Sequence, residues 1–462
     1  MAQRLALVIC VFALTSCAGQ AQLDLIYSKS ASYHSPDRNP IVVIPGMMGS
    51  SLRDRATGAL VWGAFDGRSV NPASPDGARL LALPLDASED NLEPTGVLDR
   101  IRIRLAGIPM QLAVYAQILA TLGVAGYRDS DLGTAGTVDY GDDHFTCFQF
   151  AYDWRKDNVE NAARLHAFLI EKQAYVREKY RERYGIERAE VKFDIVAHSM
   201  GGLLTRYFLR YGNQDLPDDG SLPQLNWAGA ELAERVVLIA TPNAGSLDAL
   251  VSLVEGRRLA PMLPYYSPAI LGTFPSMYQV LPRARHHRVV WADTGVPVEN
   301  PLDPALWQRL GWGLADPRQD ETLAVLMPTA ADAGARFMAA TKAQRRHLSR
   351  AQVFMAALDR PATAPVGLDL YLIAGDATDT PNRVSVDRTN GQLRILEHAA
   401  GDGTVLRSSV LLDEREGREW QPTVVTPIDY HNVLLLAESH FGITKNDSFR
   451  DNLLFWLLEE PR

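Results

Sequence analysis

The chain has 462 residues and a formal net charge of −9, with 47% apolar and 22% charged residues. These values are ordinary for a water-soluble globular protein with a large core, and they exclude disorder and repeat architectures as starting interpretations. The Lys and Arg residues are scattered, so there is no basic face for a phosphate backbone, and nucleic acid is not an expected partner. Because the net charge is negative, the protein is not expected to bind an anionic membrane surface by charge attraction, and it would have to use apolar contact or a covalent anchor.

The first 17 residues have the pattern of a secretory signal. Arg4 precedes an apolar run over residues 5–14, which is too short to span a bilayer and gives way to small residues. The run ends in LTSC, which resembles the bacterial lipobox and predicts a lipidated Cys17 at the start of the mature chain. Cleavage of an ordinary signal peptide nearby is the alternative. We therefore expect export to a bacterial cell envelope, either lipid-anchored at the periplasmic face or outer membrane, or secreted.

The cysteines and the other metal-binding residue types predict neither a disulfide nor a metal site. Cys10 and Cys17 lie in the leader, so Cys147 alone is left in the mature chain and no internal disulfide is possible. In its strand-like setting, Cys147 is expected to be a small buried apolar residue. No His, Cys and carboxylate cluster has ligand spacing, so neither a metal nor an organic cofactor is expected. The oligomeric state cannot be inferred from the sequence.

Short apolar, β-branched runs alternate with helical patterns after a linker over residues 18–38. Such runs are typical of strands buried on both faces of a parallel sheet. The expected strands are 41–44, 148–154, 191–197, 236–240, 370–374 and 433–436, and the expected helices are 114–122, 158–184, 203–211 and 448–458. This alternation predicts an α/β fold with a mostly parallel, doubly wound sheet.

Two segments interrupt the alternation. Residues 50–113 are rich in Gly, Pro and Asp and are expected to be an excursion from the core. Residues 246–365 combine helical stretches with aromatic groups, and we interpret them as a cap or lid inserted into a core formed by 39–245 and 366–462. A second packing layer without substrate contact is the alternative interpretation.

Ser199 lies in a strand, tight turn, helix sequence, VKFDIVAHSMGG, which is typical of a nucleophile elbow. In this turn a serine hydroxyl projects above the sheet, and the following helix directs its N-terminus at developing negative charge. The pattern has Ala197 where glycine is usual, which keeps a small residue but weakens the match. A plain turn serine is the alternative.

A serine nucleophile needs a base and an acid that orients the base, and in this fold they follow in the order acid, then histidine. Asp402 lies in the glycine-flanked turn AGDGTV, and Asp376 is its main rival. His440 follows the last predicted strand, where a base carried on a strand-end loop should be. His431 precedes that strand and should emerge at the opposite edge of the sheet.

An acyl-transfer oxyanion requires preorganised donors, usually the N–H after the nucleophile and one from the loop after an early strand. These groups are the N–H of Met200 and, in the loop PGMMGS, that of Met47. Gly46 and Gly49 allow this loop to approach a substrate closely. A simple strand-to-loop turn is the alternative. His198, beside Ser199, should point away and is interpreted as structural.

In order and spacing, several motifs together resemble the lecithin:cholesterol acyltransferase family of α/β-hydrolases. The motifs are IVVIPGMMGSSL, AYDWR at 151–155, VAHSMGG, ATPNAGS at 240–246, GDGTV and SHFGI. The resemblance implies an α/β-hydrolase fold with a triad of Ser199, Asp402 and His440. It also implies that Asp153 and Trp154 lie in or beside the floor of the active site and contact substrate.

The resemblance implies that an acyl-enzyme forms from a glycerophospholipid or similar ester and passes its acyl group to water or an alcohol. Two departures leave the substrate and acceptor open: no cysteine pair closes a lid loop, and residues 246–365 match the family cap poorly. An amidase or peptidase with the same triad, or an inactive lipid-binding protein of the same fold, are the alternatives.

Overall fold

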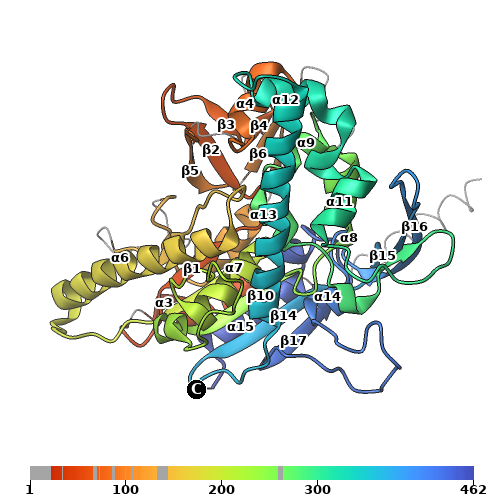
Figure 1. Ribbon diagram of the computed structural model, residues 1–462. Helices are drawn as coiled ribbons and strands as arrows, with labels where there is room; N and C mark the ends of the chain where they lie inside the picture. Colours follow the sequence, from red (N-terminus) through yellow and green to blue (C-terminus); the bar gives the residue numbers. More distant parts are fainter. Residues whose placement is uncertain are drawn as a thin grey trace, which may run out of the picture.

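A six-stranded sheet, in the order β17-β14-β10-β9-β1-β8, forms the centre of the molecule, and every neighbouring pair in it is parallel (Figure 1). The computed structural model describes residues 22–33, 35–65, 70–71, 73–85, 89–98, 100–105, 108–113, 115–132, 144–258 and 264–461. The strands are β1 (Ile41–Ile44), β8 (Cys147–Gln149), β9 (Phe193–His198), β10 (Ala233–Ile239), β14 (Asp369–Gly375) and β17 (Asn432–Leu436). The predicted parallel sheet is confirmed.

Side chains alternate between two core clusters along each buried strand, because successive residues of a strand point to opposite faces of the sheet. In β1, Val42 and Ile44 belong to one cluster, while Ile41 and Val43 belong to the other. Helices α6 (Asn158–Tyr184) and α7 (Met200–Tyr211) cover the first face, and α5 (Ala116–Val124) and α15 (Asp447–Leu458) cover the second. The result is the predicted doubly wound arrangement.

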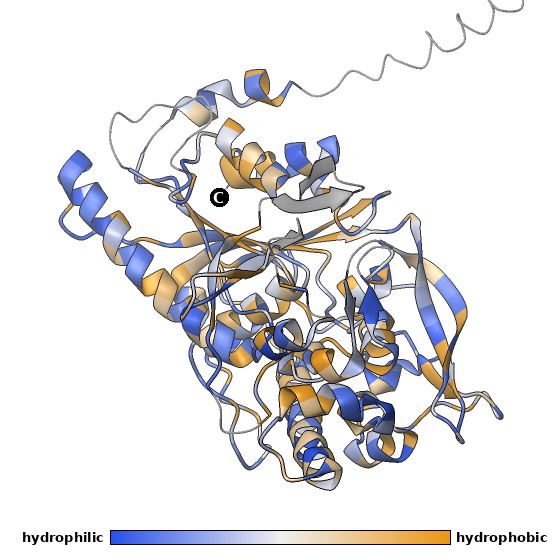
Figure 2. Ribbon diagram, turned by 90° about the horizontal axis from the view of Figure 1, so that it is seen from above, coloured by the Kyte–Doolittle hydropathy of each residue, from blue (hydrophilic) through white to orange (hydrophobic). Residues whose placement is uncertain are grey.

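Helix α6 extends well beyond the sheet, and its hydropathy follows its packing. Its first half buries apolar residues such as Leu165 and Leu169, whereas the C-terminal half is mostly polar and buries only a few residues, among them Val176 and Tyr180 (Figure 2). The helix starts at an Asp157 cap, whose side chain accepts from the N–H of Val159, and stops at Gly185 in the left-handed conformation. The predicted bounds of this helix are therefore confirmed.

The expected strand over residues 148–154 is correct only at its start. The N–H of Phe150 still donates to the carbonyl of Val43, but the N–H of Tyr152 donates to the Ser50 side chain instead of to the sheet. The chain leaves the sheet here because Tyr152 and Trp154 contact the loop that follows β1. The apolar pattern over these residues reflects burial outside the sheet.

Among residues 50–113, the predicted excursion, those that the structure describes form two small sheets and a short helix. Their elements are β2 (Ser50–Asp54), β3 (Leu60–Trp62), α4 (Pro75–Leu81) and β5 (Leu92–Val97), with β4 (Ala64–Phe65), β6 (Arg100–Leu105) and β7 (Ile108–Ala113) in the second sheet. Antiparallel pairing joins β2 to both β3 and β5. The segment lies above one end of the central sheet, next to α12 (Asp320–Leu326) (Figure 1).

Residues 246–365 are mainly helical. The elements are α8 (Leu247–Glu255), β11 (Arg257–Arg258), β12 (Tyr265–Tyr266), α9 (Pro268–Leu271), α10 (Pro275–Gln279), β13 (Val289–Trp291), α11 (Pro304–Leu310), α12 and α13 (Ala333–Asp359). Short 3-10 turns lie at Ala284–His286, Gly313–Ala315 and Pro317–Gln319. The long helix α13 runs back toward the central sheet, so the segment returns to the core where it ends (Figure 1).

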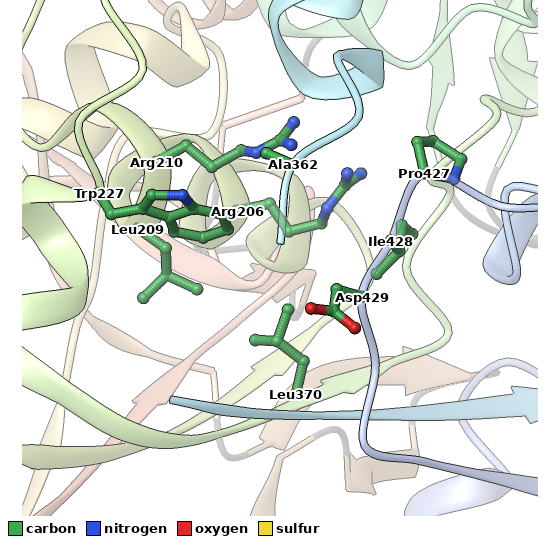
Figure 3. A pocket seen from close by; sticks show the side chains of 9 residues that line it. All are labelled: Arg206, Leu209, Arg210, Trp227, Ala362, Leu370, Pro427, Ile428 and Asp429. Carbon is green, nitrogen blue, oxygen red and sulfur yellow. The ribbon is translucent and has the colours of Figure 1, made fainter. Parts of the chain in front are cut away.

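Two buried arginines of α7 attach the C-terminal end of α13 to the core. Arg206 and Arg210 donate to the carbonyl of Leu358 at 2.8 and 2.7 Å. Cations are favourable at a helix C-terminus because the last carbonyls have no partner within the helix. Figure 3 shows both guanidinium groups beside a small pocket that Leu370 and Asp429 also line. Thus α13 is fixed to the helix that begins immediately after Ser199.

The sequence did not predict the hairpin between β14 and Asp402. Its strands β15 (Thr378–Val386) and β16 (Leu393–Gly401) pair antiparallel, and β13 adds to β15 in parallel. Most of β16 is exposed, so its pattern lacks the continuous apolar run by which the sheet strands were recognised. The short helix α14 (Arg407–Val410) and a 3-10 turn at Ile443–Lys445 follow in the C-terminal part.

Residues 22–33, which the sequence placed in a linker, pack against the C-terminal helix. They form α2 (Leu23–Ile26) and α3 (Ser28–Ser32), and the Tyr27 hydroxyl donates to the Asp451 carboxylate at 2.8 Å. Leu23 and Tyr27 are buried in the core cluster that contains α15. In the described part of the chain, no helix is both long and apolar enough to cross a membrane.

Candidate active site

Ser199 occupies the turn between β9 and α7 in a backbone conformation that side chains rarely adopt. Its φ and ψ are 53° and −128°. Its N–H donates to the carbonyl of Ile239 on the neighbouring strand at 2.7 Å. Such strained conformations persist only where surrounding contacts enforce them, and they cluster at functional sites. The structure thus has the elbow geometry expected for a projecting serine hydroxyl.

Three glycines make this turn possible because backbone and side chains approach them closely. A Cβ on Gly201 would lie 2.3 Å from the carbonyl of Pro45, and one on Gly202 would lie 1.9 Å from Thr241 Oγ1. A Cβ on Gly46 would lie 2.7 Å from the Cβ of Ser199. The loop after β1 is therefore packed directly against the serine, and no larger residue fits at these positions without a shift.

The structure brings Ser199, His440 and Asp402 together, although they come from three separate loops. His440 Nε2 lies 3.0 Å from Ser199 Oγ, and His440 Nδ1 lies 2.8 Å from Asp402 Oδ2. His440 is only 7% exposed and Asp402 only 2%. This is the arrangement in which a carboxylate orients an imidazole and the imidazole accepts a proton from the hydroxyl.

Asp402 is held as a carboxylate by its surroundings. Burial alone would raise its pKa, but His440 and the N–H groups of Val405 and Thr404 together hold the pKa below its ordinary value. These amides donate to Oδ1 at 2.7 and 2.9 Å, which leaves Oδ2 for His440. Gly375, at the end of β14, allows the close approach, since a Cβ there would lie 2.7 Å from the Cβ of Asp402.

Aromatic side chains hold the loop after β1, which contains Met47. The indole N–H groups of Trp62 and Trp154 donate to the carbonyls of Met48 at 2.8 Å and Ser50 at 3.1 Å. The two indole rings contact each other edge-on at 5.1 Å. The N–H of Met47 makes no hydrogen bond with any described residue. The loop is thus rigidly supported while this donor is left available.

Met200 offers the second predicted donor. It is the first residue of α7, and N–H groups in the first turn of a helix have no partner within it. The positive end of the helix dipole adds to the effect at the same place. Both groups predicted to bind an oxyanion therefore flank Ser199, one on the elbow itself and one on the adjacent loop.

Asp153 and Trp154, predicted to line the active-site floor, are fully buried behind the loop. Both carboxylate oxygens of Asp153 accept hydrogen bonds from Arg155, which also pairs with Asp90. Trp154 supports Ser50 as described above. Neither residue presents an exposed surface to a substrate in this structure, so their predicted contact with substrate stays a prediction.

The rival residues lie elsewhere. His431 is at the opposite edge of the sheet, where its Nδ1 lies 3.8 Å from Asp369 at the start of β14. Asp376 is paired with Arg407 at 3.8 Å, while His440 Nδ1 is bonded to Asp402 at 2.8 Å. The structure thus brings Asp402, not Asp376, to the histidine beside Ser199.

His198 is buried beneath the site and makes no hydrogen bond to Ser199. Its Nε2 lies 3.1 Å from the carbonyl of His440, and its Nδ1 lies 3.1 Å from the hydroxyl of Tyr115. Burial, reinforced by the neighbouring His440, lowers the pKa of His198 to about 3, while the hydrogen bond to His440 and the charge of Asp402 act weakly in the opposite direction. This histidine therefore stays neutral.

Sequence reasoning missed the residues that support the site. Tyr115 precedes α5 without a motif around it, and Trp62 lies in the segment expected to be an excursion. The N–H groups that bind Asp402 belong to the GDGTV turn, so that motif was the one available signal. Cys147 is buried in β8, as expected, and Cys17 lies outside the described residues.

Sheet order, helical layers and the serine elbow together define an α/β-hydrolase fold. Residues 108–305 match the sequence model of the lecithin:cholesterol acyltransferase family, which confirms the resemblance over this part of the chain. The match includes Ser199 but not Met47, Asp402 or His440, whose placement is known from the structure alone. No curated protein matches the sequence.

Several solved structures are similar in fold. A chain of the Tle4-Tli4 complex is 14% identical, with 91% of this chain and 98% of that chain covered and a TM-score of 0.50. The lipase BlEst2 of Bacillus licheniformis is 14% identical, with 92% and 95% covered and a TM-score of 0.34. Phospholipase PlaB of Legionella pneumophila is 14% identical, with 70% and 53% covered and a TM-score of 0.30. The fold and the family match over residues 108–305 support the general class of acyl-ester hydrolases and acyltransferases for this chain.

The contact of Gly202 with Thr241 gives a test of elbow packing. Gly202→Ala is expected to lower the free energy of unfolding by about 1–3 kcal/mol, because the added methyl group overpacks the turn. Thr241→Ala removes the two closest atoms and should restore part of that loss in the double variant. Urea denaturation of the two single variants and the double variant measures both effects. Equal stability of Gly202→Ala and the wild type would contradict this packing.

The neutral state of His198 predicts a pH dependence of stability. Below pH 6.5 the unfolded chain binds a proton at this residue that the folded chain does not bind until about pH 3. The contribution of this residue to the free energy of unfolding is thus complete above pH 6.5. As the pH decreases below 6.5, this contribution falls by up to about 1.4 kcal/mol per pH unit. In urea denaturation between pH 7 and 4, His198→Gln should lose less stability than the wild type. Parallel losses in the two proteins would show that His198 is protonated in the fold.

Proposed function

We propose that the protein is a serine-dependent hydrolase or O-acyltransferase that acts on lipid acyl esters through an acyl-enzyme on Ser199. The observation that carries the proposal is the position of His440, which bonds Ser199 Oγ at 3.0 Å and Asp402 at 2.8 Å through its two nitrogens. An imidazole with this pair of partners can remove the serine proton as the oxygen attacks a carbonyl carbon.

In the first step, Ser199 Oγ bonds to the ester carbonyl carbon while its proton passes to His440 Nε2. The carbonyl oxygen becomes an oxyanion, for which the N–H groups of Met47 and Met200 are the donors. The intermediate then expels the alcohol oxygen, which takes the proton from His440. Asp402 remains ionised throughout, because its role is to orient the imidazole and stabilise its charged form.

In the second step, water or an acceptor alcohol attacks the acyl-enzyme. His440 removes the proton of this nucleophile and returns it to Ser199 Oγ as the acyl group leaves. The same side chains serve hydrolysis and transfer, so the outcome depends on which nucleophile reaches the acyl-enzyme first. Support for a glycerophospholipid or similar lipid ester as the donor comes from the family match over residues 108–305 and from the family's motifs.

We also propose that residues 246–365 act as a cap over this site. Support comes from two aromatic contacts between that segment and the residues that hold the Met47 loop. Tyr266 lies 5.7 Å from Trp62, and Phe274 lies 5.6 Å from Trp154, measured between ring centroids. A segment that packs on the support of the oxyanion loop is well placed to wall a binding site for an acyl chain.

Labelling by a fluorophosphonate tests the nucleophile. The wild type should be labelled, Ser199→Ala should not, and His440→Ala should react at least about 100-fold more slowly because it lacks the base. His431→Ala is the matched control, since the same substitution at the opposite edge of the sheet should leave labelling unchanged. Strong labelling of folded Ser199→Ala would refute the assignment, and an unlabelled wild type would favour an inactive lipid-binding protein.

Incubation with phospholipid vesicles, with and without a sterol or long-chain alcohol, tests the substrate class. Mass spectrometry of the products should detect free fatty acid, or an acyl ester of the added alcohol, in the wild type and in neither case with Ser199→Ala. Cleavage of amide substrates with intact phospholipid would instead favour an amidase or peptidase. The ratio of the two lipid products identifies the preferred acceptor.

We propose that the mature protein is exported and tethered to the bacterial cell envelope through lipidated Cys17. Support comes from the leader sequence ending in LTSC. In bacterial cells, the wild type should be recovered with membranes and incorporate a labelled fatty acid, whereas Cys17→Ser should do neither. Cys147→Ser is the control, and incorporation of label into Cys17→Ser would contradict the anchor site.

A further inference from the structure

A buried chain of hydrogen bonds joins the loop after β1 to the backbone of His440. The N–H of Gly46 donates to the Tyr115 hydroxyl at 2.7 Å. The same hydroxyl lies 3.1 Å from His198 Nδ1, and His198 Nε2 lies 3.1 Å from the carbonyl oxygen of His440. The chain thus runs from the oxyanion loop, through two side chains, to the residue proposed as the general base.

The two end groups of this series of hydrogen bonds, the N–H of Gly46 and the carbonyl of His440, fix the direction of every bond in it. The backbone N–H of Gly46 can only donate, so the Tyr115 oxygen accepts there and its proton is free to point elsewhere. The carbonyl of His440 can only accept, so the hydrogen of His198 is on Nε2. His198 Nδ1 then has no hydrogen and accepts from Tyr115. All groups are satisfied when His198 is neutral, which agrees with its burial and lowered pKa.

The backbone of His440 is held on both sides. Its N–H donates to the carbonyl of Asp402 at 2.9 Å, and its carbonyl accepts from His198. The rings of His198 and His440 also lie against each other, with centroids 4.8 Å apart. Asp402 therefore fixes the imidazole and the backbone N–H of His440. His198 fixes the backbone carbonyl of His440 and packs against its ring.

The other end of the chain is equally close to the reacting atoms. Gly46 lies against Ser199 and immediately precedes Met47, the proposed oxyanion donor. A shift of Gly46 would therefore move this donor relative to the serine. Because Tyr115 and His198 bond both ends, a displacement of the loop and a displacement of His440 are mechanically linked.

We propose that Tyr115 and His198 are positioning residues that set the distance between the general base and the oxyanion donor across Ser199. This inference rests on the proposed function. Neither side chain touches the substrate or transfers a proton in the reaction. Their effect is to hold two loops, remote in sequence, within the small tolerance that the chemical step requires, where an error near 1 Å costs about 100-fold in rate.

Tyr115→Phe tests this role because it removes the central hydroxyl and leaves the ring. With a short-chain ester, kcat per folded molecule should fall by about 10- to 100-fold while KM stays within about twofold, since the substrate pocket is untouched. Tyr127→Phe is the matched control: Tyr127 is buried in the same core cluster as Tyr115 but contacts Arg38 instead of the site. It should keep the wild-type kcat.

Two substitutions of His198 separate positioning from simple packing. His198→Gln can place an amide N–H near the position of Nε2 and keep the bond to His440, whereas His198→Asn keeps an acceptor near Nδ1 and loses that bond. The Gln variant should therefore retain at least about tenfold more kcat than the Asn variant at similar stability. A merely structural role would lower stability in both variants and leave kcat per folded molecule equal.

The outcomes distinguish this inference from the proposed function. A wild type that turns over esters while Tyr115→Phe and His198→Asn match it in kcat overturns the positioning role alone. A wild type that neither labels with fluorophosphonate nor turns over any ester overturns the proposed function and the positioning role with it. Nitrogen NMR of His198 gives an independent readout: a neutral ring with hydrogen on Nε2 is expected, and hydrogen on Nδ1 contradicts the chain.

Discussion

The site depends on one steric constraint: three backbone segments meet at Ser199 more closely than side chains allow. The end of β9, the start of α7 and the loop after β1 converge there because Gly46 and Gly201 lack side chains, while Gly202 leaves room for the side chain of Thr241. This contact forces the serine into its strained conformation and brings the Met47 loop beside its hydroxyl. The histidine and aspartate only complete a geometry that the glycines have already determined.

Most of the sheet was predictable because burial on both faces leaves a continuous apolar run in the sequence. β1, β9, β10 and β14 have this pattern, whereas β17, at the edge of the sheet, is apolar in sequence but only partly buried. The carboxyl ends of all five strands meet at one edge of the sheet. Two segments were predicted wrongly. Residues 150–154 were expected to be strand because they are mostly apolar, but they pack against the loop after β1, and β16 was not predicted because it is exposed and lacks a continuous apolar run. The apolar pattern of a sequence indicates that residues are buried, but it does not distinguish burial in the sheet from burial elsewhere in the core.

The three residues of the site were found from motif and chain order, and their meeting was expected from the topology of a parallel sheet. Their support was not predictable in the same way. Tyr115, Trp62 and Trp154 each bond a backbone group of Gly46, Met48 or Ser50, and of the three side chains only Trp154 belonged to a recognised motif. A backbone group leaves no trace in a sequence, so the partner of such a bond can be recognised only when the fold is known.

The hairpin of β15 and β16 separates Asp402 from the strand that precedes it, yet the two remain side by side. The hairpin is closed at its base, where Thr378 pairs with Gly401 and the Thr380 hydroxyl accepts from the N–H of Gly403. The length of the outer portion consequently has no bearing on where the carboxylate lies. The turn of the hairpin is anchored separately, because the indole N–H of Trp312 donates to the carbonyl of Gly391 at 2.7 Å. A change at the turn would therefore be felt first by residues 246–365, whereas the closed base keeps the carboxylate in place.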